Sequence, residues 1–420
     1  MRATWLPVFV AIVAAGCRTD PGPGPAGAGA EGAGAEGAGG AGVEGGIGIV
    51  DPLPLVDRRQ REAVAAALAR AGENRPELEQ ALREIDPDLR RGMAFLVATM
   101  PERDLRCLSS SFLLGNVREA YSAWRAAPWG SGIPEDTFLR YILPYANLNE
   151  ARDDWRADFA RRFQAKAFEI GGKSGDPMEA VRWVNDRLND ELKVQYHATR
   201  RRAPDQGPYE SMALGYASCT GLSILLTDAL RACGIPARCV GCPAWTGTPG
   251  NHTWVEAWWD RWWNIGDTGS DPRDANWVNE RCRLETDGEK PRNAVWAAWW
   301  QPTGEHFPVP WNWSIAWIPG RNVTRFYREP VEAAVAVPNM TPQGHAGEAD
   351  RFPATVLAYW HEELVARHRV ENAGEAATLH LAMGEAFRIE VRFANGELEV
   401  REGFMPRSAL ETAPGTEPGA

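Results

Sequence analysis

The fold is decided by one stretch of the sequence, Gly215-Tyr-Ala-Ser-Cys219-Thr-Gly-Leu-Ser-Ile-Leu-Leu-Thr-Asp-Ala-Leu-Arg-Ala-Cys233-Gly-Ile-Pro236. Its apolar residues recur with the period of a helix, and Gly234 and Pro236 end that pattern. The spacing therefore predicts a helix that begins at Cys219. A thiol at a helix N-terminus lies at the positive end of the helix dipole, which favours the reactive thiolate.

A histidine and an aspartate follow this helix. His252 begins the run His-Thr-Trp-Val-Glu-Ala-Trp-Trp, and Asp267 ends the run Arg-Trp-Trp-Asn-Ile-Gly-Asp. Both runs are rich in residues that favour β-strands, so the sequence predicts a hairpin with residues 260–261 at its tip.

The register of this hairpin decides whether the two side chains can meet. If Trp259 pairs with Trp262, then Asp267 faces Trp254 and lies diagonally from His252. A diagonal pair is separated by roughly 7–8 Å between backbones, which two side chains can bridge. An odd-numbered loop would break this arrangement.

The three residue types form a nucleophilic set. Cys219 is the expected nucleophile, and His252 is the base that takes its proton and later protonates the leaving group. Asp267 is the expected carboxylate that orients the imidazole and supports its positive charge.

Four segments of the sequence resemble the transglutaminase-like superfamily of papain-type cysteine enzymes. They are Ala217-Ser-Cys219, Leu230-Arg-Ala-Cys-Gly-Ile-Pro-Ala-Arg238, His252-Thr-Trp-Val-Glu256 and Trp263-Asn-Ile-Gly-Asp267-Thr. The resemblance covers about residues 176–270. It implies an α+β fold whose papain-like catalytic core contains an antiparallel sheet, and it assigns the nucleophile, base and orienting acid to Cys219, His252 and Asp267.

The sequence departs from the family pattern in one place and leaves one family feature without a residue. Asp267 is followed by Thr-Gly-Ser-Asp271, which makes Asp271 a second candidate for the orienting acid. The family also uses a side chain upstream of the cysteine to stabilise the oxyanion, and no residue is assigned to that role. The backbone N–H of Cys219 is the donor that we expect.

Composition limits the remaining possibilities. A chain of 420 residues with 44% hydrophobic content can form two or three domains. Its net charge of −11 argues against a nucleic-acid partner. We expect no metal or other cofactor, because the thiol supplies the chemistry.

The N-terminus has the pattern of a bacterial lipoprotein. Residues 1–17 are predicted as a signal peptide that ends at Cys17, the expected lipid anchor. Residues 18–50 are predicted as a disordered Gly/Ala/Glu linker. We expect a protein of the cell envelope, attached to a membrane on its periplasmic or outer-membrane face. The alternative is an ordinary secretory signal, in which case the protein is secreted.

Three further regions follow the linker. Residues 51–170 are predicted as a helical N-terminal domain, with helices at 58–70, 88–100, 117–126 and 151–168. Residues 171–330 are predicted as the catalytic domain.

Residues 331–405 are predicted as a small antiparallel β domain, plausibly a sandwich. Its expected strands are 354–360, 364–370, 377–383, 387–393 and 398–404, and Asn395-Gly396 is a hairpin signal between the last two. Residues 406–420 are predicted as a disordered tail.

Thirteen of the nineteen tryptophans lie between Trp245 and Trp317. They either fill the sheet as core or form a platform for sugars and extended peptides. Trp254, on the strand face of His252, is the expected substrate contact, and Tyr216 and Asn251 flank the catalytic residues as further candidates.

Five cysteines remain besides the expected nucleophile and the expected lipid anchor. They are Cys107, Cys233, Cys239, Cys242 and Cys282, so at most two disulfides can form among them. A bridge from Cys239 or Cys242 to Cys282 is one possibility. Neither zinc nor redox chemistry is favoured for the Cys239-Val-Gly-Cys242 pair, because no second pair of ligands accompanies it.

The sequence thus predicts a cysteine hydrolase that acts on amide bonds through a thioester. Its substrate would be a peptide or protein amide, including cell-wall peptide or glycan. An amine-transferring cross-linker and a non-catalytic envelope protein that binds peptide or glycan are the alternatives.

Overall fold

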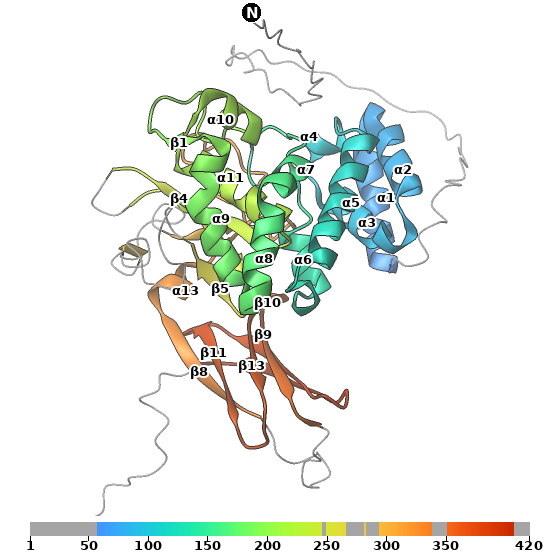
Figure 1. Ribbon diagram of the computed structural model, residues 1–420. Helices are drawn as coiled ribbons and strands as arrows, with labels where there is room; N and C mark the ends of the chain where they lie inside the picture. The colour runs from blue at the N-terminus through green and yellow to red at the C-terminus, as the bar shows by residue number, and fades with distance from the viewer. Residues whose placement is uncertain (1–56, 246–248, 266–280, 283–293, 338–350, 407–420) are drawn as a thin grey trace, which may run out of the picture.

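The computed structural model describes residues 57–245, 249–265, 281–282, 294–337 and 351–406. It shows a mixed fold with a helical N-terminal part followed by antiparallel sheets, as predicted (Figure 1). The expected signal peptide, lipid anchor Cys17, linker and C-terminal tail lie outside the described residues, as does Asp267.

The N-terminal part consists of short helices. They are α1 (Arg58–Arg70), α2 (Arg75–Glu84), α3 (Arg90–Thr99), α4 (Glu102–Leu105), α5 (Ser110–Ala126), α6 (Glu135–Tyr141) and α7 (Arg156–Phe159). The predicted helix at 58–70 is confirmed, and it begins there because the Asp57 carboxylate accepts a hydrogen bond from the backbone N–H of Gln60 at 2.8 Å.

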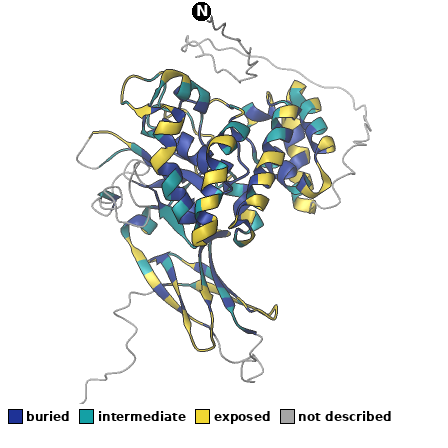
Figure 2. Ribbon diagram, in the orientation of Figure 1, coloured by how far each residue is buried: buried dark blue, intermediate teal, exposed yellow. Residues whose placement is uncertain are grey.

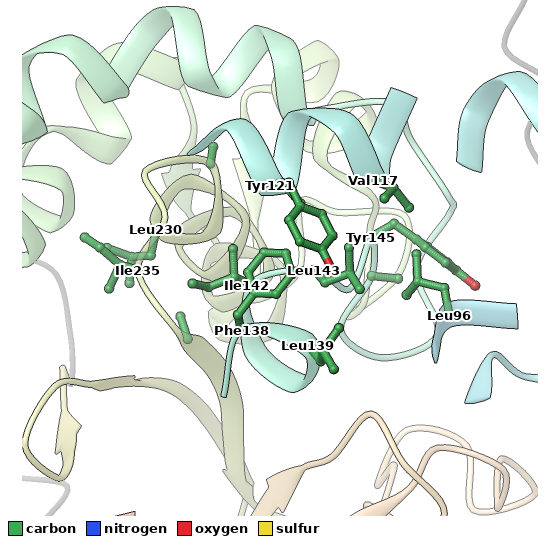
Figure 3. Packing of buried hydrophobic residues seen from close by; sticks show 14 of the residues in the cluster. Leu96, Val117, Tyr121, Phe138, Leu139, Ile142, Leu143, Tyr145, Leu230 and Ile235 are labelled. Atoms are coloured by element: carbon green, nitrogen blue, oxygen red, sulfur yellow. The ribbon is translucent and has the colours of Figure 1, made fainter. Parts of the chain in front are cut away.

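The apolar faces of these helices share one core with the helix of the nucleophile. Figure 3 shows Tyr121 of α5 and Phe138 of α6 close to Leu230 and Ile235, which lie near the end of that helix. A single cluster of buried side chains continues from α1 into the catalytic region. The helical part therefore supports the site directly.

Helices continue through the expected boundary at residue 170. A π-helical turn (Ala160–Gln164) joins α7 to α8 (Ala165–Ser174), which runs across that boundary. Then follow α9 (Pro177–Leu192), β1 (Gln195–Tyr196), α10 (Pro208–Leu214), β2 (Tyr216–Ala217) and α11 (Cys219–Ala232). Figure 1 shows α11 at the centre of the helical part with α9 beside it. No helix of the described part of the chain is long and apolar enough to cross a membrane.

A five-stranded sheet packs against α11. Its order is β5-β4-β3-β6-β7, and every neighbouring pair is antiparallel. The strands are β3 (Ala237–Cys242), β4 (His252–Trp258), β5 (Trp262–Asn264), β6 (Trp296–Ala298) and β7 (Gly320–Asn322). The contacts of β3 and β4 with α11 bring the start of the helix to the start of β4.

The predicted register of the β4–β5 hairpin is wrong by one residue. Trp258, not Trp259, pairs with Trp262, so paired residue numbers sum to 520. The loop has three residues, and it is closed by a 3.1 Å hydrogen bond from the N–H of Trp259 to the carbonyl of Arg261. Because this loop is odd-numbered, the diagonal placement of Asp267 beside His252 does not follow from the register.

The C-terminal region is a β-sandwich. One sheet has the order β10-β9-β12-β13 and the other pairs β8 with β11. After the short helix α13 (Thr324–Arg328), the strands are β8 (Pro330–Ala336), β9 (Ala354–Trp360), β10 (Glu363–Val370), β11 (Ala376–Ala382), β12 (Phe387–Arg392) and β13 (Leu398–Phe404). The hairpin at Asn395-Gly396 is confirmed, with Gly396 at φ 89°. Figure 2 shows buried positions at the centre of the helical part and within this sandwich.

Candidate active site

Cys219 is the first residue of α11, as the sequence predicts. The helix begins here because the Ser218 hydroxyl accepts a hydrogen bond from the N–H of Gly221 at 3.2 Å. The same hydroxyl donates to the carbonyl of Pro204 at 2.6 Å, which fixes the turn that precedes the helix. The nucleophile candidate is therefore held at the positive end of a fourteen-residue helix.

The structure brings His252 to Cys219. Burial acts to raise the pKa of Cys219, but the hydrogen bond and charge of His252, with smaller contributions from Thr253 and Thr220, outweigh it, so the pKa of this thiol lies below its ordinary value. Cys219 is half-buried and His252 is half-buried. This pair can exchange a proton while remaining open to a substrate.

Two threonines that the sequence analysis did not single out complete the surroundings of the thiol. The backbone N–H of Thr253 and the hydroxyl of Thr220 both form hydrogen bonds with Cys219 that favour its thiolate. The two hydroxyls also bond to each other at 3.0 Å. Each threonine directly follows a catalytic candidate in the sequence, and that adjacency is the signal that could have identified them.

Helix and strand are joined at the site by a further buried side chain. The Ser223 hydroxyl bridges the carbonyls of Cys219, at 2.8 Å, and Thr253, at 3.0 Å. This contact fixes the distance between the first turn of α11 and the first residues of β4. The position of the imidazole relative to the sulfur is thus set by backbone-directed bonds.

Trp254 does not lie in an open groove, contrary to the prediction for this residue. Its side chain is 1% exposed, and its ring is stacked on the ring of His252 at 5.8 Å between centroids and 20° between planes. The indole N–H donates to the Tyr327 hydroxyl at 2.9 Å. Trp254 supports the imidazole from beneath and presents no surface to a substrate.

The other two substrate-contact candidates differ in position. Asn251 is exposed and lines a narrow crevice together with His252, Cys242 and Trp311. Tyr216 is half-buried on β2, and the Arg200 guanidinium lies 4.8 Å from the centre of its ring. Asn251 therefore remains adjacent to the imidazole, whereas Tyr216 borders the segment that leads into α11.

The described tryptophans of the tryptophan-rich region are mostly buried or partly buried against the core. Trp258, Trp296 and Trp299 are buried, whereas Trp313 and Trp317 are exposed by 46% and 37%. The exposed rings belong to the segment that follows β6, not to the tryptophan pairs that the sequence made conspicuous.

The described cysteines near the site do not form the disulfide considered from the sequence. None of Cys239, Cys242 and Cys282 forms a disulfide, and all three are buried, as is Cys233. Burial raises the pKa of Cys239 to about 12, which leaves it a neutral thiol. No group of three or more potential metal ligands occurs among the residues that the structure describes.

Comparison with known families agrees with the resemblance found in the sequence. Residues 164–267 match the model of the transglutaminase-like superfamily, and this segment extends from the π-helical turn through α11 and β4. No curated protein matches the chain. The chain thus contains a transglutaminase-like domain, which begins twelve residues before the expected start of the resemblance at about residue 176.

Proposed function

We propose that the protein is a thiol hydrolase that cleaves amide bonds, a peptidase or amidase of the transglutaminase-like type. The observation that carries this proposal is the contact between Cys219, at the start of α11, and His252, at the start of β4, with the pKa of the thiol lowered. A transglutaminase-like domain that spans both residues supports it.

The reaction would proceed in two balanced steps. The Cys219 thiolate attacks the amide carbonyl while His252 holds the thiol proton, and this proton passes to the amine as the C–N bond breaks. A thioester remains on the sulfur. His252 then takes a proton from water, the hydroxide attacks the thioester, and the proton returns to the sulfur as the carboxylic acid leaves.

Asp267 is proposed as the carboxylate that orients the imidazole, and Asp271 is the alternative. Each is tested by replacement with asparagine in the full chain. Loss of an orienting carboxylate lowers turnover by as much as about 10⁴-fold and leaves the nucleophile in place. We therefore expect Asp267→Asn to abolish turnover but retain alkylation of Cys219, and Asp271→Asn to leave turnover unchanged. The reverse result would assign the role to Asp271.

The hydrolase is tested with peptide libraries and cell-wall fragments as substrates. Wild-type protein should release new amines or ammonia, and Cys219→Ala should not. Cys233→Ala is the matched control, because it makes the same change in a buried thiol that follows the last turn of the same helix. Faster incorporation of a labelled primary amine than release of product would instead indicate a cross-linking transferase.

A non-catalytic binder would need no activated thiol. Alkylation at mildly acidic pH separates the two functions, because a thiolate reacts there and an ordinary thiol does so slowly. Equal rates for Cys219 and for an unperturbed thiol would support the binder and contradict the enzyme.

We further propose that Cys17 is lipidated and that residues 18–50 tether the enzyme to the cell envelope. Cells grown with a labelled fatty acid should incorporate the label into the wild-type chain and not into Cys17→Ala. Label in neither protein would indicate secretion.

A further inference from the structure

A series of buried polar contacts begins beneath His252. Trp254, whose ring stacks on the imidazole, donates its indole N–H to Tyr327 of α13 at 2.9 Å. Tyr327 in turn donates its hydroxyl proton to Glu256 at 2.6 Å. Both aromatic side chains are buried, so the orientation of each ring is fixed by packing on its faces and by hydrogen bonds at its edge, one for Trp254 and two for Tyr327.

The contacts continue into the C-terminal sandwich. The second oxygen of Glu256 accepts from Arg238 Nε at 2.7 Å, and Arg238 Nη1 donates to Glu363 of β10 at 3.0 Å. The same Glu363 oxygen accepts from the Tyr141 hydroxyl of α6 at 2.8 Å and from Trp262 Nε1 at 2.9 Å. Figure 1 shows α13, β5 and β10 at the level where the helical part adjoins the sandwich. We call these five connected residues the Glu363 network: Trp254, Tyr327, Glu256, Arg238 and Glu363.

A contribution to stability does not explain why the sandwich places the carboxylate of Glu363 in a buried position. Glu363 is 2% exposed, and its Oε2 has no hydrogen-bond partner among the described residues. Burial raises the pKa of Glu363, so keeping this carboxylate ionised lowers the stability of the folded state. A buried ion pair is weak support for stability, whereas a connected polar network fixes geometry.

We propose that Glu363 is a positioning residue for His252, acting through Arg238, Glu256, Tyr327 and Trp254. The C-terminal sandwich is thereby a working part of the catalytic unit, and not a separate binding module. This inference rests on the proposed function, in which His252 is the base. Among the residues that the structure describes, the groups that face the imidazole include the thiols of Cys219 and of Cys242, its cross-strand partner on β3, and the ring of Trp254.

The first test removes one hydroxyl from the Glu363 network. Tyr327→Phe leaves the ring and takes away the group that joins Trp254 to Glu256. We expect the pH profile of Cys219 alkylation to move to higher pH, and a displacement by one pH unit lowers the rate on its acidic side about tenfold. The matched control is Tyr145→Phe, which removes another buried hydroxyl bonded to a carboxylate, that of Asp104 at 2.9 Å. The control should lower stability but leave the profile unchanged.

The second test acts within the sandwich. Glu363→Ala should move the pH profile of Cys219 alkylation in the same direction. The profile of Glu363→Gln should lie close to that of wild type, because the amide oxygen can still accept a hydrogen bond from Arg238. The control is Glu390→Ala, which removes a buried carboxylate on β12 of the same sheet that is paired with Arg388 and Arg392. Equal profiles for Glu363→Ala and wild type would refute the proposal.

A direct readout on His252 separates failure of this proposal from failure of the proposed function. In Cys219→Ala, the imidazole titration is followed by NMR and assigned by comparison with His252→Gln. If Tyr327→Phe and Glu363→Ala move this titration and Tyr145→Phe does not, the positioning role is supported even where Cys219 reacts as an ordinary thiol. If none of them moves it, the role is wrong even where the enzyme is active.

Discussion

Replacement of Ser218 by alanine tests whether the first turn of α11 is held as the structure indicates. The hydroxyl makes two hydrogen bonds, accepting from the N–H of Gly221 at 3.2 Å and donating to the carbonyl of Pro204 at 2.6 Å. Loss of an N-cap costs about 1 kcal/mol. Loss of the second bond adds about 1 kcal/mol, because Ser218 is buried and water does not readily replace it.

The chain contains a matched control. Ser109 caps α5 by accepting from the N–H of Phe112, also at 3.2 Å, but Ser109 is half-buried, and among the described residues its hydroxyl otherwise bonds with the exposed Ser111. Ser109→Ala should therefore cost about 1 kcal/mol and Ser218→Ala about 2 kcal/mol. The difference isolates the contribution of the Pro204 contact.

The assay is equilibrium unfolding in urea at constant pH, followed by tryptophan fluorescence, with the slopes compared among wild type and both variants. Equal losses of unfolding free energy for Ser218→Ala and Ser109→Ala would refute this account of the turn. A greater loss for Ser109→Ala would also refute it.

Four other predictions concern a buried carboxylate, two helix glycines and the reactivity of Cys219. Burial raises the pKa of Asp228 well above its ordinary value, so the folded state binds this proton more tightly than the unfolded state does. The unfolding free energy should therefore fall as pH rises above about 4, and Asp228→Asn should flatten this decline in a series of urea titrations. Gly115→Ala should raise the unfolding free energy by about 0.5–1 kcal/mol, because the new methyl group meets nothing within 4 Å in the interior of α5. Gly171→Ala should lower it by about 1–3 kcal/mol, because the methyl group would lie 2.3 Å from the Trp129 ring, and thermal melting of both variants checks the opposite signs. In native protein, Cys219 should be the first thiol to be alkylated, and mass spectrometry of timed samples should find every other described thiol unmodified in that fast phase.

Features set by local sequence could be predicted. The start of α11 depends on Ser218, and its end depends on Gly234, which has φ 68°, and on Pro236. Each of these residues lies close in the chain to the helix end that it defines. The strands of the sandwich could be predicted for the same reason, since alternation and the Asn395-Gly396 turn are properties of neighbouring residues.

Features set by distant residues could not be predicted. The β4–β5 register depends on whether Trp258 or Trp259 is the last paired residue of β4. Because both residues are tryptophans, the sequence does not favour one register over the other. The burial of Trp254 depends on Tyr327, which lies 73 residues away in the sequence. Strand β8 was not among the predicted strands, because three of its seven residues are alanines, which have a weak preference for strands, and it is stabilised by pairing with the distant β11.

The buried charges of Arg238, Glu256 and Glu363 hold both the candidate site and the junction with the sandwich in place. Arg238 lies between two carboxylates, Glu256 and Glu363, so the cluster carries one more negative than positive charge in a place from which water is excluded. A cluster of apolar residues of similar volume would be at least as stable, since desolvation offsets most of the attraction between buried ions. Contacts between apolar side chains, however, are not directional. The hydrogen bonds of a guanidinium to two carboxylates are directional, so they fix the relative positions of the three groups. The charges lie where α6, β4 and β10 meet, and the same contacts that fix this junction also fix the ring beneath His252. The placement of His252 and the docking of the sandwich therefore depend on the same buried contacts.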